Sequence, residues 1–404
     1  MLNNHIARIN GMPHTAWNRT ALQILLVLGG AWLARSGPIT FTPPSDAPGP
    51  FALWDLSTSL RADVGHRENV LLSSTNLHSS GFITLGGDLF LFRLPVDGTS
   101  FSILFSAEDR RYVNASDGST NGPGASKEQT FLTHASLKKP LANQWTVSLK
   151  ALHLYADQVF DASYEVDTAS TLEVGVGTIQ AQGHHLALTP AFRRDFGPGF
   201  WGELSTPIIR QYYRAPISSF WEGGPKLTVG WSYRTNSSVE ILLSAMRRPY
   251  DDRFQISRIG AANPNLSLTT DDMKAEIAWR HDWDAEARWQ SVARLFYVHR
   301  VENGSGWFDL DRLGTILSGS YRISKWTFQG TARWLTYDFP LQRASPFDLA
   351  TRTRDELELE GRIEYRLHEK WLLNVAYQNE HVRSNVPLDD YRANTVSAGI
   401  EFEF

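Results

Sequence analysis

From about residue 52 to its C-terminus the chain repeats one pattern, in which apolar and polar side chains alternate over runs of about ten residues. The last eleven residues, NTVSAGIEFEF, place Val396, Ile400 and Phe404 on one side and Glu401 and Glu403 on the other. Successive side chains of a β-strand point to opposite faces, so each run predicts a strand with one apolar and one polar face. No run keeps a helical period over three turns. The predicted fold class is therefore all-β.

The connections between these runs follow a rhythm of their own. Short polar connections lead into an aromatic residue at several places, namely Phe101, Trp145, Trp201, Trp289, Trp326 and Trp371. Longer connections rich in Gly, Asn, Asp and Ser, such as residues 113–129, separate the resulting hairpins. A membrane-spanning barrel has short turns at one end, long loops at the other and aromatic girdles at the two interfaces. The rhythm favours this architecture over a soluble sandwich.

The prediction is an antiparallel transmembrane β-barrel with short periplasmic turns and long external loops. About sixteen strands are expected, with fourteen or eighteen as the alternatives, and an even number places both chain ends on one side. The expected strand starts are residues 53, 82, 100, 129, 144, 184, 200, 226, 238, 272, 288, 312, 326, 355, 371 and 393. Residues 157–183 fit the rhythm least well and are interpreted as one long external or inward-folded segment.

The N-terminal part predicts export. The run ALQILLVLGGAWLA, residues 21–34, is apolar, follows Arg8 and Arg19, and is followed by small residues. This is the pattern of a secretory signal peptide, and a buried core helix is the alternative. The expected organisation is a signal peptide over residues 1–36, a proline-rich periplasmic tether over 37–51 and the barrel over 52–404. The expected location is the outer membrane of a Gram-negative cell after signal-peptide cleavage.

The C-terminal strand carries a resemblance to known proteins. Its end at Phe404, after alternate apolar residues, resembles the assembly signal of Gram-negative outer-membrane proteins. The resemblance implies that Phe404 is an assembly signal for the barrel assembly machinery. Residues 384–404, SNVPLDDYRANTVSAGIEFEF, look like the last strands of surface-lipoprotein assembly-modifier barrels and of some exopolysaccharide-associated barrels. Assembly-modifier proteins usually carry helical repeats before the barrel, and this chain shows none.

Composition excludes several classes of function. The net charge of −4 argues against binding nucleic acid, which favours a basic face. The absence of cysteine excludes a disulfide framework and a thiolate metal site. No metal or cofactor is expected. An enzyme is not expected either, because Ser305 has no histidine beside it, while His281, His299, Asp251 and Asp252 form no recognisable catalytic set.

The polar faces of the strands predict the lining of an aqueous lumen. The expected pore-lining residues are Lys274, Glu276, Arg280, Arg294, Arg333, Glu358, Glu360, Arg362 and Glu364. Mixed charges in a lumen tune which solutes pass. The alternative is that these charges pair across neighbouring strands and hold the wall in shape. Acidic residues of the segment 157–183 are expected to face Arg280, Arg294 and Arg333 if that segment folds inward.

The preferred function is a channel for small polar solutes, passive or weakly selective. The first alternative is an export or assembly barrel that passes a polysaccharide or a lipoprotein with periplasmic partners. The second alternative is a structural or adhesive barrel. Outer-membrane lipids and the barrel assembly machinery are the expected partners, and a homo-oligomer is left open.

Overall fold

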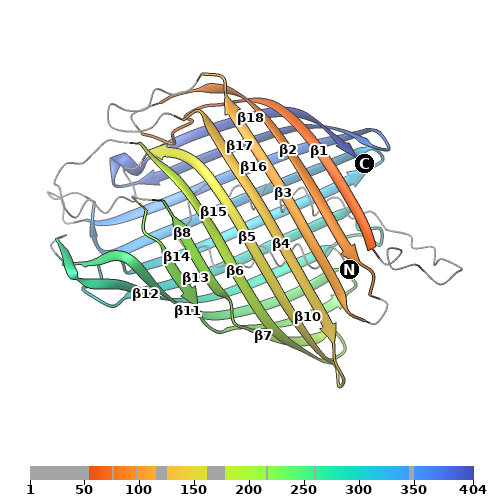
Figure 1. The fold of residues 1–404 in the computed structure, drawn as a ribbon, viewed down its shortest axis with the longest axis horizontal. Coiled ribbons are helices and arrows are strands. Elements are labelled where there is room, and N and C mark those ends of the chain that lie inside the picture. The colour runs from red at the N-terminus through yellow and green to blue at the C-terminus, as the bar shows by residue number, and fades with distance from the viewer. Residues whose placement is uncertain are drawn as a thin grey trace, which may run out of the picture.

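The computed structural model describes residues 54–74, 77–95, 98–114, 125–161, 178–214, 217–258, 261–344 and 350–404. These residues form one antiparallel sheet of tilted strands that closes on itself (Figure 1). The strand segments are β1 (Trp54–Arg67), β2 (Ser80–Arg93), β3 (Ser100–Tyr112), β4 (Lys127–Pro140), β5 (Trp145–Asp161), β6 (Thr178–Gly197), β7 (Phe200–Ser205), β8 (Ile208–Tyr213), β9 (Phe220–Gly223), β10 (Lys226–Arg234), β11 (Ser237–Ile256), β12 (Ala262–Asp282), β13 (Trp289–Glu302), β14 (Leu310–Ile323), β15 (Trp326–Arg343), β16 (Thr351–His368), β17 (Trp371–Ser384) and β18 (Tyr391–Glu403).

Two of the barrel strands are interrupted by proline. Both β7 and β8 pair with β6, and Pro207 lies between them. Likewise β9 and β10 both pair with β11, and Pro225 lies between them. Proline has no backbone N–H for the ladder, so it breaks the pairing locally. The eighteen segments are thus sixteen spanning strands, which confirms the predicted fold class and strand number.

The first and last strands close the barrel. They pair from Ser59 opposite Glu403 to Arg67 opposite Thr395. The backbone N–H of Phe404 continues the ladder by donating to the Thr58 carbonyl oxygen at 3.0 Å. Closure removes both open edges of the sheet, as a strand in lipid requires.

Short turns gather at the end of the barrel that holds the C-terminus. Two-residue turns join β6 to β7, β10 to β11, β14 to β15 and β16 to β17. The β4–β5 turn has positive φ at Asn143 and Gln144, which is the geometry of a type I′ hairpin turn. The connections at the opposite end all have five residues or more. The predicted rhythm is therefore confirmed.

The prediction for residues 157–183 is wrong at both of its ends. β5 continues to Asp161 and β6 begins at Thr178, and the two strands pair from Asp157 opposite Gln182 to Asp161 opposite Thr178. Both strands are longer than the apolar layer requires. The alternation at residues 157–161 and 178–183 therefore belongs to the ends of β5 and β6 and does not mark an additional strand across the membrane. Residues 162–177, which include Glu165 and Asp167, lie outside the described residues.

The two faces of the strands differ in the predicted sense. On β18 the exposed fractions of Val396, Ile400 and Phe404 are 50%, 38% and 64%, whereas Glu401 is 3% exposed. The same inversion recurs around the barrel, where leucine, isoleucine and valine face outward and charged residues face inward. An apolar outer band of this kind is what a lipid bilayer covers.

Aromatic residues ring the short-turn end, with one exception to the prediction. Trp145, Trp289, Trp326 and Trp371 face outward and are exposed. Trp201 instead is 3% exposed, and the Arg193 guanidinium lies 4.1 Å from the centroid of its ring. Gly230 of β10 leaves room for this ring inside the barrel, because a Cβ there would collide with it. Its neighbour Phe200 takes the outward position.

The only helical element in the described part of the chain is a short 3₁₀ turn, η1 (Pro387–Asp389). Within the same residues, no helix combines the length and the apolar character that a membrane span needs.

Candidate functional site

The inner wall of the barrel gathers the charges that the sequence predicted there. Each of the predicted residues alternates with an outward neighbour on its strand, so its side chain faces the interior. They come from four strands, with Lys274, Glu276 and Arg280 on β12, Arg294 on β13, Arg333 on β15, and Glu358, Glu360, Arg362 and Glu364 on β16. Six are buried, at 6–8% exposure, and Arg294, Glu360 and Arg362 are half-buried. The structure thus brings the whole set to one stretch of wall.

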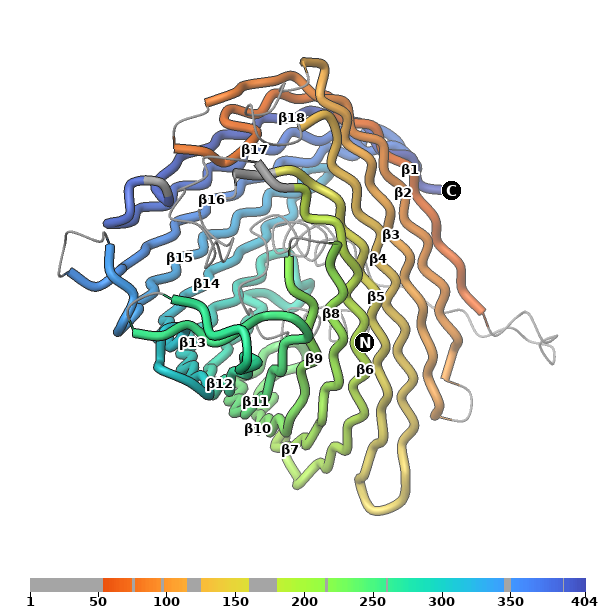
Figure 2. Tube along the Cα trace, turned by 60° about the vertical axis from the view of Figure 1, so that its left-hand side comes forward, coloured from red at the N-terminus to blue at the C-terminus, as the bar shows by residue number. Residues whose placement is uncertain are grey.

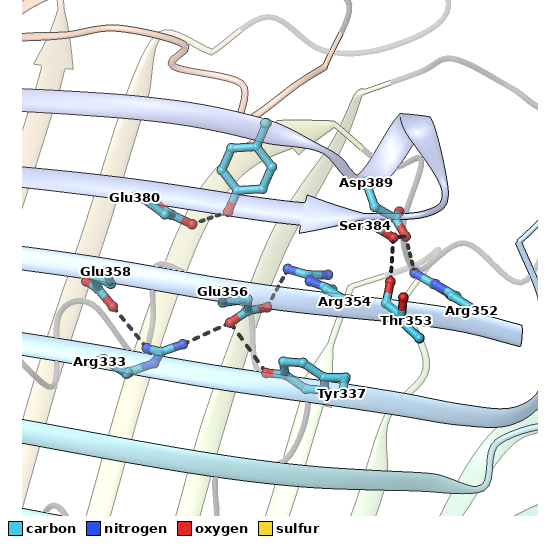
Figure 3. A network of polar contacts seen from close by, with 11 residues as sticks. Arg333, Tyr337, Arg352, Thr353, Arg354, Glu356, Glu358, Glu380, Ser384 and Asp389 are labelled. Carbon is cyan, nitrogen blue, oxygen red and sulfur yellow. Dashed lines mark hydrogen bonds and ion pairs between the residues drawn. The ribbon is translucent and has the colours of Figure 1, made fainter.

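Arg333 shows how these charges are held. Its guanidinium lies between two carboxylates of β16, at 3.1 Å from Glu356 and 3.1 Å from Glu358 (Figure 3). Glu356 also pairs with Arg354 at 2.5 Å and accepts a hydrogen bond from Tyr337. The cluster ties β15 to β16 across the wall. Lateral pairing, the alternative reading of the sequence, therefore describes Arg333.

Other members of the predicted set pair along a single strand. Lys274 lies 2.5 Å from Glu276 on β12, and Arg362 lies 2.8 Å from Glu364 on β16. Residues two apart share one face of a strand, which places the opposite charges side by side.

The remaining two arginines have acidic electrostatic neighbours. Asp282 is a neighbour of Arg280, while Glu276 and Glu240 are neighbours of Arg294. The prediction that acids of residues 157–183 face these arginines is wrong for Asp157. Its carboxylate pairs with Lys127 at 3.2 Å and accepts a hydrogen bond from Gln180, within its own part of the sheet. The side chain of Asp161 lies outside the described residues.

A second ionic cluster lies on β1–β4 and was not in the predicted set. Arg61 pairs with Glu108 at 2.8 Å, and Arg67 pairs with Glu128 at 2.8 Å. Arg110 lies between the two carboxylates, 3.5 Å from Glu108 and 3.2 Å from Glu128. In LRADVGHR, residues 60–67, Arg61 and Arg67 alternate with outward-facing neighbours, but the sequence does not indicate their partners.

A third cluster joins β9, β11, β12 and β13. Arg248, 2% exposed, pairs with Glu222 at 2.7 Å and with Asp272 at 3.4 Å. Asp272 also receives two hydrogen bonds from Arg300, at 2.7 and 2.9 Å. Because Asp272 is shared by arginines of β11 and β13, the cluster fixes the wall beside the β9–β10 interruption.

The first long connection folds into the mouth of the barrel. Val70 and Leu71, 1% and 0% exposed, pack against the inward-facing Phe82 and Tyr112. Leu72 packs on the other side against Val382 and Tyr391. In Figure 2 this orange connection lies beside the blue strands at one end of the barrel.

Hydrogen bonds also hold this connection between β1 and β2 in place. The Asn69 side chain accepts from the Ser73 N–H at 2.9 Å and donates to the Ser73 carbonyl at 2.8 Å. The same amide donates to the Arg392 carbonyl of β18 at 3.0 Å. Val159 of β5 belongs to the same buried cluster, so the connection and the end of β5 pack together at this mouth. The apolar run VLL in a polar connection was its one signal in the sequence.

The inner wall also has an apolar patch. Phe296, Val298, Ile316 and Leu335 form a buried cluster with further residues of β13–β15, Leu310, Tyr337 and Phe339. Arg312, 3% exposed, lies near the Phe296 and Tyr337 rings. The lumen face is therefore mixed, with ionic clusters on either side of a packed apolar one.

The residues weighed for catalysis have structural partners. The Ser305 hydroxyl donates to the Ile256 carbonyl at 2.6 Å, and His281 lies 2.8 Å from the Tyr233 hydroxyl. Asp251 pairs with Arg210 at 2.5 Å.

His299 and Asp311 form a pair on the outer face of β13 and β14, with Nδ1 2.8 Å from the carboxylate. The Ser305 hydroxyl, in the loop between these two strands, donates instead to the Ile256 carbonyl, so the three residues form no triad in the described chain.

Outside the barrel wall, the β12–β13 turn contains a charged clasp. The Asp284 carboxylate accepts hydrogen bonds from the Arg288 side chain at 2.8 Å and its backbone N–H at 2.6 Å. Desolvation opposes ionisation of Asp284, but these hydrogen bonds outweigh it, so the pKa of this carboxyl lies below its ordinary value. The clasp holds the turn in shape while Asp284 is ionised.

No family model and no curated protein is similar to this chain. Solved structures with partial similarity include an anion-selective porin from Comamonas acidovorans, with 11% identity over 87% of this chain and 99% of that chain and a TM-score of 0.43. The copper transporter OprC has 11% identity over 87% of this chain and 80% of that chain, with a TM-score of 0.42. A bacterial polysaccharide outer membrane secretin has 10% identity over 85% and 98%, with a TM-score of 0.40.

Proposed function

We propose that this protein is an outer-membrane channel through which small polar solutes diffuse, with no selectivity or only weak selectivity for charge. The observation that carries the proposal is the inversion of the barrel. Its outer face is apolar and its inner face holds charges of both signs, from Arg61 on β1 to Glu401 on β18. A sixteen-stranded barrel is wide enough for an aqueous lumen.

Weak charge selectivity follows from how the charges are arranged. Arg333 lies between Glu356 and Glu358, and Arg110 lies between Glu108 and Glu128. Opposite charges this close largely cancel beyond the Debye length of about 8 Å at physiological salt. A passing ion therefore meets little net potential at the centre of the lumen.

The proposal assigns roles to the predicted residues. Lys274, Glu276, Arg280, Arg294, Arg333, Glu358, Glu360, Arg362 and Glu364 form part of the pore lining. Phe404, exposed at the end of the closing strand, serves as the signal that the barrel assembly machinery reads. The working location is the outer membrane after removal of the signal peptide.

A planar-bilayer recording tests the channel. The mature chain is expected to insert in discrete conductance steps, with a cation-to-anion permeability ratio close to one. Replacing Arg333 by Gln removes the positive charge that lies between Glu356 and Glu358, so it should shift that ratio towards cations. Full insertion without current would contradict the channel.

The second candidate is an export barrel for a polysaccharide or a lipoprotein. It is favoured by the resemblance of residues 384–404 to the last strands of such barrels. An export barrel works with periplasmic proteins, so cross-linking in intact cells should capture one at the short-turn end. A channel that conducts alone and cross-links to no periplasmic protein would contradict this candidate.

A further inference from the structure

A hollow lies in the inner wall where the barrel closes. Ala376 of β17 and Ser397 of β18 are aligned in one register row, and the Phe82 ring covers Gly65 of β1 at the end of that row. In the next row Gly399 of β18 separates Asn374 from Asp63. These small residues interrupt a wall that elsewhere carries long charged side chains. The result is a recess open to the lumen, lined by residues of β1–β4 and β16–β18.

Asn374 is a buried donor. Its side chain is 4% exposed, and its amide nitrogen finds no hydrogen-bond partner among the residues that the structure describes. It lines the recess. A buried polar group is normally hydrogen-bonded, so an unsatisfied one at a cavity indicates a missing partner.

Two carboxylates on the rim have arginines as electrostatic neighbours, Arg61 for Asp63 and Arg362 for Glu360. Asp63 and Glu360 both line the recess, and within the described chain neither makes a hydrogen bond or an ion pair. Their neighbours Glu108 and Glu128 are held by arginines. Asp63 leans over Gly399, where a Cβ would collide with its carboxylate, so glycine is required for this arrangement.

The charges of the recess nearly cancel. Three arginines and four carboxylates line it: Arg61, Arg110 and Arg362, and Asp63, Glu108, Glu128 and Glu360. A cation would gain little net attraction and an anion even less. A hydroxyl group, by contrast, both donates and accepts, as the two rim carboxylates and the Asn374 amide require.

We propose that this recess binds a small neutral polyhydroxylated solute, a mono- or disaccharide, with hydroxyls that donate to Asp63 and Glu360 and accept from Asn374. The inference rests on the proposed function, because the solute reaches the recess through the lumen. Ser397, Thr395 and Thr84, which also line the recess, add hydroxyls that suit the same chemistry.

Binding is tested apart from conduction, by saturation-transfer NMR on the detergent-solubilised mature protein with maltose as the probe. Saturable binding at millimolar concentration is expected. Arginine hydrochloride and sodium gluconate, the charged comparators, should bind at least tenfold more weakly. Absent or non-saturable maltose binding, or tighter binding of either charged solute, would overturn the proposal.

Variants locate the site. Ser397→Phe fills the hollow and should abolish maltose binding. Asn374→Leu removes the buried donor and should weaken binding about tenfold, the usual value of one such hydrogen bond. Ser148→Phe, on an inward position of β5 that does not line the recess, is the matched control and should bind as the parent does. Unchanged binding in Ser397→Phe would overturn the assignment of the recess.

Two further readouts keep the claims separate. Each variant is first checked for the shift in gel mobility that a folded barrel shows on heating. If a variant does not fold, the parent protein's preference for maltose over the charged solutes still tests the proposal. Conductance without saturable maltose binding overturns the recess and leaves the channel. Maltose binding without conductance supports the recess and overturns the channel.

Discussion

The two faces of β16 have opposite chemistry within a single run of sequence, ELELEGRIEYRL. Leu357 and Leu359 point outward and are 39% and 41% exposed, whereas Glu356 and Glu358 point inward at 8% and 7%. In a soluble protein the leucines would be covered and the glutamates hydrated at the surface. Here lipid covers the leucines, and arginines of the neighbouring strand and the lumen satisfy the glutamates. The two faces of β16 therefore differ in what surrounds them, which is lipid on the outside and ionic partners and the lumen on the inside.

The largest expected effect comes from placing a charge on the outer face. Leu359→Arg should lower the free energy of unfolding by about 2–4 kcal/mol, since lipid cannot hydrate the guanidinium. Thr331→Arg is the matched control, because it puts the same side chain inside, in register with Glu360. Urea unfolding in lipid vesicles measures both. Equal losses would contradict the assignment of the two faces.

Breaking the inner ionic cluster should cost less. Arg333→Met leaves Glu356 and Glu358 without this partner and should lower the free energy of unfolding by about 1–3 kcal/mol. The double variant Arg333→Met with Glu358→Met should recover part of the loss. A double-mutant cycle by urea unfolding measures the coupling, and strict additivity of the two substitutions would mean that the pair does not interact.

The inward connection should affect conduction more than stability. Leu71→Asp puts a carboxylate between Phe82 and Tyr112, which should release residues 68–74 from the mouth. Single-channel conductance should rise, and the global unfolding transition should change little, because the opening is local. Leu77→Asp, on an exposed position of the same connection, is the control. An unchanged conductance would mean that this connection does not narrow the path.

The smallest effect is expected outside the membrane, in the β12–β13 turn. The pKa of Asp284 is lowered in the folded state, so its contribution to stability is present above the unfolded pKa, about 3.9, and is lost as the pH falls through the lower folded value. Asp284→Asn should remove this dependence. Hydrogen exchange of the turn amides between neutral and acidic pH measures it, and an identical profile for the variant and the parent would contradict the clasp.

The alternation of side chains predicted the barrel because its period is a property of the strand itself. The closure of β18 on β1, the outward Phe404 and the inward faces of β12 and β16 all follow from it. Alternation gives the face of a residue but not its partner, so the bridges from Arg333 and from Arg61 required the structure. Trp201 was misplaced because the space for its ring comes from Gly230 on another strand. The inward fold of residues 68–74 depends on apolar positions of five other strands.

The absence of native cysteine allows the central claim to be tested at single residues. Leu359→Cys and Glu360→Cys are adjacent in sequence and differ only in the face they occupy. In intact vesicles, a membrane-impermeant thiol reagent should label the cysteine at 360 rapidly through an aqueous lumen. It should leave the cysteine at 359 unlabelled, because a thiol in lipid does not form the reactive thiolate. Labelling at 359 and protection at 360 would contradict the account.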